Sequence, residues 1–250
     1  MSGDRVTWAG HSTVLLEMGG ARVLTDPVLR ARVAHLRRHG EKPSADLAER
    51  LDAVLISHLH YDHLDVPSLR GIAGEVRAFG PHGARALLRR AGFADVTELQ
   101  PGEAGEVGGV RVAAVPAAHD PRRRPLGPRG EPLGFVLEAG SRVYFAGDTD
   151  LFAGMSDIGP VDVALLPVAG WGPELGNGGH LDPESAARAA ALIRPKVAVP
   201  IHWGTLHPRG RRLGEWFTEP ARRFAAHAAE LAPDVEVRVL TPGESLVLKA

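Results

Sequence analysis

Four side chains that can bind a metal ion lie within six residues of the sequence, at His58, His60, Asp62 and His63. They follow an apolar run that is typical of a buried strand. In extended chain alternate side chains share a side, so His58 and His60 can reach one metal ion. The chain is then expected to turn into a helix with Pro67 in or near its first turn, which would carry Asp62 and His63 toward a second ion.

Three more residues with ligand side chains each follow a predicted strand: His119, Asp148 and His202. Strand ends that converge on one edge of a sheet would bring them into one cleft with the first four. Asp148 is the only carboxylate of the three and could bridge two ions. Two ions about 3.5–4 Å apart would generate a hydroxide near neutral pH and hold the attacking and leaving oxygens, which predicts hydrolysis without a protein nucleophile.

The sequence has no cysteine, so thiolate nucleophiles, disulfides and sulfur-bound zinc are excluded. Imidazole and carboxylate ligands suit two divalent ions, with zinc as the first expectation and manganese or iron as alternatives. Histidines that stand alone in the sequence are interpreted as surface or core residues without a metal. These are His35, His39, His82, His207 and His227.

Short β-branched runs bounded by Gly, Pro or Asp predict the strands that must position these residues. They are Val6–Trp8, Thr13–Glu17, Arg22–Thr25, Ala53–Ser57, Val110–Val115, Gly134–Glu138, Val143–Ala146, Val163–Pro167 and Val197–Ile201. Helices are predicted over Pro81–Ala91, Pro183–Ile193 and Glu215–Leu231. The last has an apolar stripe, which favours core packing over a membrane face. Strands followed by alternating strands and helices predict packed sheets with helices outside.

Composition narrows the class of protein further. The 250 residues are 44% hydrophobic and 24% charged, which is typical of a globular fold. We expect one domain, residues 1–250. The net charge of −1 argues against a nucleic-acid partner. With no apparent signal peptide and no run of 18 apolar residues, we expect a cytoplasmic protein that does not span a membrane and acts on a small molecule. Its oligomeric state stays open, a homo-oligomer included.

Two irregular stretches carry candidate substrate-binding residues. The stretch 120–132 contains Arg122, Arg123 and Arg124, whose guanidinium groups could bind phosphate through paired hydrogen bonds. A solvated basic loop is the alternative. The stretch 170–179 is rich in glycine and contains Trp171, the second candidate.

The motif His58-x-His60-x-Asp62-His63 resembles that of the metallo-β-lactamase superfamily. The resemblance extends over nearly the whole chain and implies an α/β fold, a four-layer αββα sandwich of two mixed β-sheets flanked by helices. It also implies the metal ligands. The first ion would be held by His58, His60 and His119, the second by Asp62, His63 and His202, with Asp148 between them. Asp26 looks like the family's early aspartate that orients ligand histidines by hydrogen bonds.

Further segments resemble one branch of that superfamily. They are Trp8 to Glu17, Gly147-Asp148-Thr149, Gly179 to Glu184 and Pro200 to Thr205. The branch includes L-ascorbate-6-phosphate lactonases and phospholipases D that hydrolyse N-acyl-phosphatidylethanolamine. His11 and His180 lie on predicted loops of these segments, where each could bind an anionic oxygen or protonate a leaving group. Alternatively, His180 merely precedes Asp182, the expected cap of the next helix.

The expected function is therefore a cytoplasmic binuclear metal-dependent hydrolase in which a metal-bridging hydroxide attacks a phosphoester, phosphodiester or lactone. Asp62, Asp148, His180 and His11 are the candidate catalytic residues. An iron-dependent oxidoreductase on the same fold, an RNA-processing nuclease and a non-catalytic scaffold are the alternatives. The complete ligand set argues against the scaffold, and the absence of a long RNA-binding arm argues against the nuclease.

Overall fold

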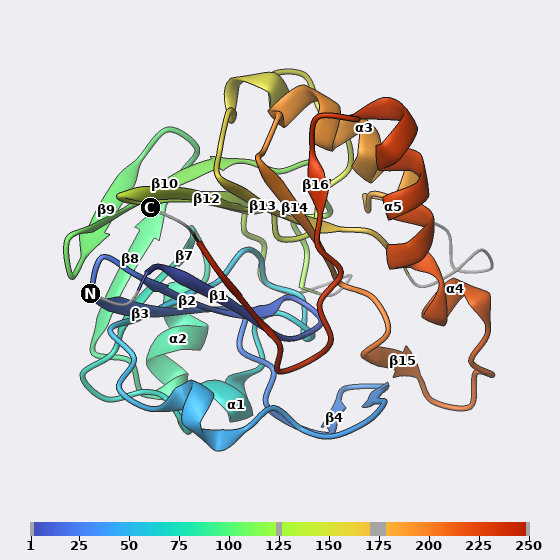
Figure 1. Ribbon diagram of the computed structural model, residues 1–250. Helices are drawn as coiled ribbons and strands as arrows, with labels where there is room; N and C mark the ends of the chain where they lie inside the picture. The colour runs from blue at the N-terminus through green and yellow to red at the C-terminus, as the bar shows by residue number, and fades with distance from the viewer. Residues whose placement is uncertain (1–2, 124–126, 171–178, 249–250) are drawn as a thin grey trace.

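The computed structural model describes residues 3–123, 127–170 and 179–248, and it shows two β-sheets packed face to face with helices outside (Figure 1). In spatial order, the strands of the first sheet are β17 (Ser245–Val247), β1 (Arg5–Gly10), β2 (Thr13–Met18), β3 (Ala21–Thr25), β6 (Ala53–Leu55), β7 (Arg77–Pro81) and β8 (Asp95–Leu99). Those of the second sheet are β16 (Glu236–Val237), β14 (Val197–Ile201), β13 (Val163–Pro167), β12 (Ser141–Phe145), β11 (Leu133–Ala139), β10 (Val110–Pro116) and β9 (Ala104–Val107).

Each sheet is mixed. Strands β17, β1, β2 and β3 pair antiparallel, whereas β3, β6, β7 and β8 run parallel. The second sheet repeats this division, antiparallel from β9 to β12 and parallel from β12 to β16. A small third sheet is formed by β15 (Leu206–Pro208), β5 (Leu36–Arg38) and β4 (Arg32–Val33). The predicted four-layer sandwich is confirmed.

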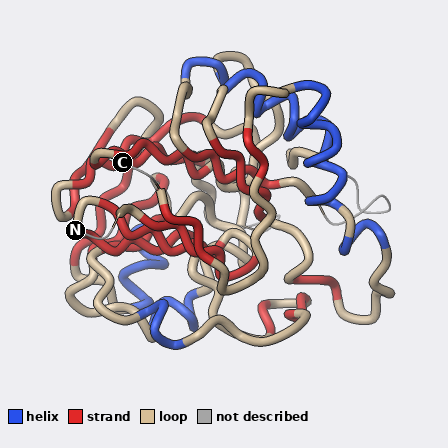
Figure 2. Tube along the Cα trace, in the orientation of Figure 1, coloured by secondary structure: helices blue, strands red, loops and turns tan. Residues whose placement is uncertain are grey.

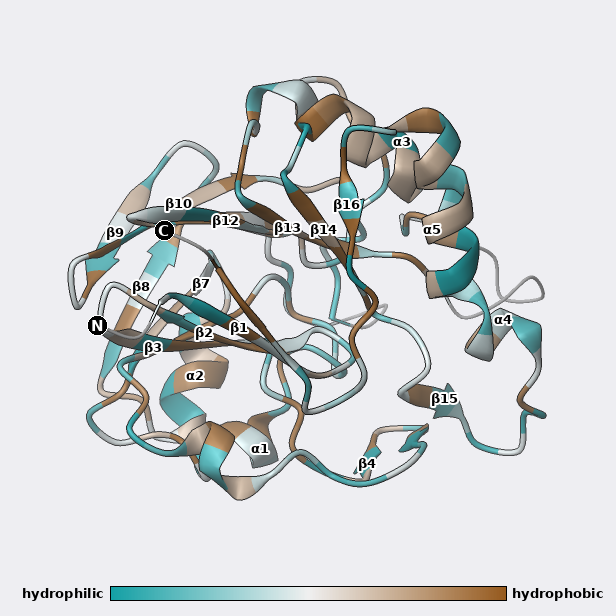
Figure 3. Cartoon of the chain, viewed as in Figure 1, coloured by the Kyte–Doolittle hydropathy of each residue, from teal (hydrophilic) through white to brown (hydrophobic). Residues whose placement is uncertain are grey.

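The core lies in three layers because side chains along each strand alternate between its two faces. In β12, Val143 and Phe145 point into the core between the sheets, while Tyr144 packs toward the helices outside. In β2, Leu16 faces the other sheet and Leu15 faces outward. Hydrophobic segments recur along β13 and β14 in Figure 3, and Figure 2 shows the strands stacked between the helices.

Helices cover the outer face of each sheet. Below the first sheet in Figure 1 lie α1 (Val66–Arg70) and α2 (Arg85–Ala91). Above the second lie α3 (Pro183–Ile193) and α5 (Pro220–Leu231), with α4 (Glu215–Thr218) preceding α5. Two 3₁₀ turns cover Ala45–Ala48 and Met155–Asp157. Among the described residues, no helix is long and apolar enough to cross a membrane.

Two predicted helices have the wrong limits. The helix predicted from Pro81 begins only at Arg85, because Pro81 is the last residue of β7. The helix predicted over Glu215–Leu231 is two helices, because Pro220 has no N–H to donate and instead begins α5 in the position that proline favours. The predicted helix Pro183–Ile193 and the strands Val163–Pro167 and Val197–Ile201 have the expected limits.

Candidate metal centre

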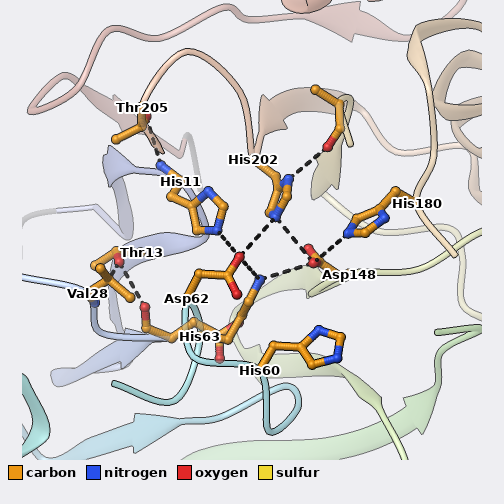
Figure 4. A network of polar contacts seen from close by, with 12 residues as sticks. His11, Thr13, Val28, His60, Asp62, His63, Asp148, His180, His202 and Thr205 are labelled. Atoms are coloured by element: carbon orange, nitrogen blue, oxygen red, sulfur yellow. Dashed lines mark hydrogen bonds and ion pairs between the residues drawn. The ribbon is translucent and has the colours of Figure 1, made fainter. Parts of the chain in front are cut away.

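The candidate ligands gather where strands of both sheets end. The residues after β6 supply the first four, and a short turn then leads into α1, whose N-cap Asp65 accepts a hydrogen bond from Ser68 N. From the second sheet, His119 follows β10, Asp148 follows β12 and His202 follows β14. Figure 4 shows that Asp62, His63, Asp148 and His202 converge, with His11 and His180 on either side of them.

Ligand atoms of the described residues form four overlapping groups in this region, the members of each lying within 4.8 Å of one another. Two of these groups join Asp26 to His58 and His63, and Asp148 to His119 and His180. The other two contain most of the expected ligands: one consists of His58, His60 and His119, and the other of His11, Asp62, His63 and His202. Asp148 lies between them. Its Oδ2 is 3.0 Å from His63 Nε2 and 3.2 Å from His202 Nε2, and 3.9 Å from Nε2 of both His58 and His119.

Hydrogen bonds to outer oxygen atoms orient four of the five ligand histidines. His119 Nδ1 donates to the Gly179 carbonyl at 2.7 Å, and His202 Nδ1 donates to the Ala169 carbonyl at 2.8 Å. Each of these rings therefore carries its proton on Nδ1. Its Nε2 is left with a lone pair that points toward the centre.

Asp26 orients the other two rings in the same way. His63 Nδ1 lies 2.7 Å from Asp26 Oδ2, the same oxygen that accepts from Ser57 Oγ at 2.6 Å. Because Ser57 Oγ gives its proton to Asp26, it accepts from His58 Nδ1 at 2.9 Å. One buried carboxylate thus sets which nitrogen of both rings faces inward.

Ligand nitrogens crowd together at the centre. His60 Nδ1 lies 2.9 Å from His58 Nε2 and 3.1 Å from His119 Nε2, and both of these Nε2 atoms carry lone pairs. Asp148 Oδ1 is buried and has no hydrogen-bond partner among the described residues. Imidazole nitrogens and carboxylate oxygens that converge on one space are the ligands that zinc and similar divalent ions take. The residues therefore fit a metal pair.

The charges around the centre also favour the binding of cations. Burial lowers the pKa of His11 to about 3 and that of His119 to about 4, so both rings are neutral at pH 7. Burial also works against the charge on His63, but Asp148, Asp62 and Asp26 outweigh it and raise the pKa of His63 well above its usual value. A buried site with three carboxylates attracts positive charge, which either protons or metal ions can supply.

His11 and His180 each contact one of the two central carboxylates. His11 Nε2 lies 3.0 Å from Asp62 Oδ2 and, because the ring is neutral, donates its proton there. His180 Nε2 lies 3.1 Å from Asp148 Oδ2, and its Nδ1 has no hydrogen-bond partner among the described residues. Both rings are buried. His180 also precedes Asp182, which caps α3 through Ser185, so the two interpretations of this segment are compatible.

The arginines of the stretch 120–132 do not form a set of side chains that face one phosphate site. The buried Arg123 donates to the main-chain carbonyls of Leu59 and Leu64, the latter at 3.1 Å, and so braces the segment that carries the ligands. Arg122 is exposed, and its backbone N–H donates to Asp120. Arg124 and Trp171 lie outside the described residues.

Sequence reasoning missed several groups that hold the ligands. The hydroxyl of Ser57 has no motif of its own, although its place before His58 could have suggested a contact. Carbonyl groups such as those of Gly179 and Ala169 leave no signal, because every residue has one. Gly147, before Asp148, has φ +60°, and an added Cβ would lie 2.5 Å from that of Ser57, so only glycine fits this close approach.

A family model for the β-lactamase superfamily domain matches residues 21–203. The chain is 34% identical over 252 residues to a UPF0173 metal-dependent hydrolase of Methanopyrus kandleri, covering 96% of this chain and 98% of the relative. It is 32% identical over 246 residues to the N-acyl-phosphatidylethanolamine-hydrolyzing phospholipase D 1 of Caenorhabditis elegans, covering 88% of this chain and 68% of that protein. A solved structure of Igni18, a metallo hydrolase from the archaeon Ignicoccus hospitalis, superposes with a TM-score of 0.75, 27% identity and coverage of 99% of both chains.

Proposed function

The chain belongs to the metallo-β-lactamase superfamily, and on this basis we propose that it is a hydrolase that works with two divalent metal ions. The observation that carries the proposal is the convergence of imidazole nitrogens and carboxylate oxygens on one buried space, with Nδ1 of His119 and of His202 donating to outer carbonyl groups. The Methanopyrus relative, which matches the chain over almost its full length, is also a metal-dependent hydrolase.

We assign three ligands to each of two ions and propose that the carboxylate of Asp148 is shared between them. The imidazoles of His58, His60 and His119 would hold one ion, and Asp62, His63 and His202 would hold the other, with Asp148 shared. When bound, such a pair supplies an activated water near neutral pH and polarises the bond that breaks. Zinc is the first expectation for these nitrogen and oxygen ligands, with manganese or iron as alternatives.

The remaining polar side chains position ligands and move protons. His11, as a neutral donor to Asp62, holds this carboxylate in one orientation. His180 lies beside Asp148 with Nε2 toward the centre, where an imidazolium could protonate a leaving oxygen. The pKa of His180 supports this role: burial lowers it, but the negative charge of Asp148 more than offsets burial and raises it.

For the substrate we propose a phosphoester, phosphodiester or lactone of a small, phosphorylated molecule. The phospholipase relative from Caenorhabditis elegans supports the phosphodiester among these. An iron-dependent oxidoreductase and an RNA-processing nuclease are the competing functions. The complete set of seven ligands favours hydrolysis over the first, and the net charge of −1 argues against the second.

The test combines metal analysis of the purified protein with assays on bis(p-nitrophenyl) phosphate and a panel of lactones. We expect about two equivalents of zinc or manganese and turnover of at least one substrate class. Asp148→Ala should lower turnover by more than about a hundredfold, because it removes the shared carboxylate. Asp157→Ala, which removes an exposed carboxylate outside every candidate ligand group, should change nothing. One equivalent of iron, oxygen consumption and no hydrolysis would replace this proposal with the oxidoreductase.

A further inference from the structure

A cavity that none of the candidate metal ligands lines lies beside the segment that carries them. It has a volume of about 510 Å³ and opens between α1, α2, β4 and the chain near Pro128. Helices α1 and α2, which form two of its walls, lie together below the first sheet in Figure 1. The volume is within the range of about 300–1,000 Å³ that is typical of small-molecule sites.

Positive charge dominates the lining of this cavity. Its described lining includes four arginines, Arg30, Arg70, Arg90 and Arg123, against one carboxylate, Asp65. Arg30 already pairs with Asp65 through two hydrogen bonds of 2.7 and 2.8 Å. The same carboxylate also caps α1 by accepting from Ser68, and among the described residues it forms an ion pair with Arg30 and with none of the other three guanidinium groups.

Two of those three guanidinium groups are available to a ligand. Arg70 and Arg90 are exposed, and the guanidinium group of neither forms a hydrogen bond or ion pair with another described residue. Arg123 is only 9% exposed and donates to main-chain carbonyls, and it forms no ion pair with a described carboxylate, although the charges of Asp65 and Asp62 act on it. A concave surface with three such charges attracts an anion even though the whole chain has a net charge of −1.

The rest of the lining fits an organic group rather than a free ion. Val33, Val66 and Leu87 contribute apolar side chains. The ring of Tyr61 is 40% exposed, and the guanidinium carbon of Arg123 lies 4.1 Å from its centroid. An aromatic ring backed by a cation and flanked by apolar side chains suits a flat or aliphatic body that carries the anion.

From these observations we propose that the cavity binds a small organic phosphate, with Arg70 and Arg90 holding the phosphate and Tyr61 contacting the organic part. Guanidinium groups match phosphate because they offer paired donors in a plane. Tyr61 lies between the candidate ligands His60 and Asp62, so a bound molecule would contact the segment that forms the metal centre. This binding site does not depend on the proposed hydrolysis.

The test uses phenylphosphonate, which has an aromatic ring and an anionic head but no ester to hydrolyse. It is titrated by calorimetry into the metal-loaded protein, into Arg70→Gln/Arg90→Gln and into Arg89→Gln. Arg89 is an exposed arginine of α2 that does not line the cavity, so it is a matched control. We expect the double variant to bind about tenfold or more weakly, because two charge-assisted contacts are lost, and the control to match the wild type.

Equal affinity in all three proteins would overturn the proposal, since phenylphosphonate would then be bound at the metal centre alone. Absence of saturable binding to the wild type would overturn it too. The calorimetry remains decisive even if no hydrolysis is ever observed. Where hydrolysis is observed, a KM raised only for phosphorylated esters in the double variant identifies the bound phosphate as part of the substrate. An unchanged KM, together with a rate that responds to phenylphosphonate, identifies a separate ligand.

Discussion

At the scale of single residues, neighbouring contacts hold parts of the centre in strained backbone conformations. Three of its residues have positive φ without being glycine: His11 at 55°, Asp26 at 34° and His202 at 60°. Such conformations cost about 1–3 kcal/mol each and persist where neighbouring contacts fix them. Here His202 N donates to the His11 carbonyl, whereas His11 N donates to Thr205 Oγ1, both at 3.0 Å. The strain indicates a site whose geometry is set before a substrate arrives.

His180 allows the sharpest test at this scale. If it protonates the leaving group, His180→Gln should lower kcat by about 10²–10⁴-fold, because the amide can still donate to Asp148 but has no titratable proton to transfer. Metal content should stay at the wild-type value, which separates this loss from loss of ligands. His82→Gln, at an exposed histidine, is the control. A variant that keeps the wild-type kcat and pH profile would show that His180 only positions Asp148.

At the scale of elements, the sequence indicated the strands and helices that have a strong hydrophobic pattern. It did not indicate strands that form only because a neighbouring strand pairs with them. The strands Val163–Pro167 and Val197–Ile201 are continuous apolar runs because both faces are buried, and their limits were predictable. The strand Asp95–Leu99 mixes acidic and apolar residues at a sheet edge, and Arg32–Val33 exists only by pairing with Leu36–Arg38. No local pattern marks either one.

The N-terminal cap of α3, the helix after His180, allows a test of how much a local sequence pattern contributes to the free energy of unfolding. Asp182 caps α3 by accepting from Ser185 N at 2.8 Å, and Ser185 Oγ accepts from Asp182 N in return. Asp182→Ala should therefore lower the free energy of unfolding by about 1 kcal/mol, whereas Asp182→Asn should lower it much less because asparagine also caps. Urea unfolding at constant m-value measures both changes. Equal losses in the two variants would mean that the cap contributes little to stability.

At the scale of the whole molecule, the candidate centre joins the two sheets. His58, His60, Asp62 and His63 follow a strand of the first sheet, whereas His119, Asp148 and His202 follow strands of the second. The sequence could indicate these seven positions, because ligand side chains at strand ends are visible in it. Apart from Asp26, which the family resemblance suggested, it could not indicate which outer oxygen orients each ring, because those contacts cross between segments far apart in the chain, as from His119 to Gly179.

Because ligands from both sheets would share the ions, removing the ions should weaken the whole fold. At a free metal concentration of about 100 times Kd, each bound ion adds about 2.7 kcal/mol to the free energy of unfolding. For two ions in a chain of this size that corresponds to about 11–22 °C in Tm. Chelation with EDTA should lower Tm by this amount at pH 7.5, and added zinc should restore it.

Ligand imidazoles must be neutral to bind, so this stabilisation should be present at neutral pH and disappear as pH falls toward about 5, where protons displace the ions. Asp148→Ala should show a much smaller response to EDTA. An unchanged wild-type Tm after verified loss of metal would mean that side-chain packing alone holds the two sheets together.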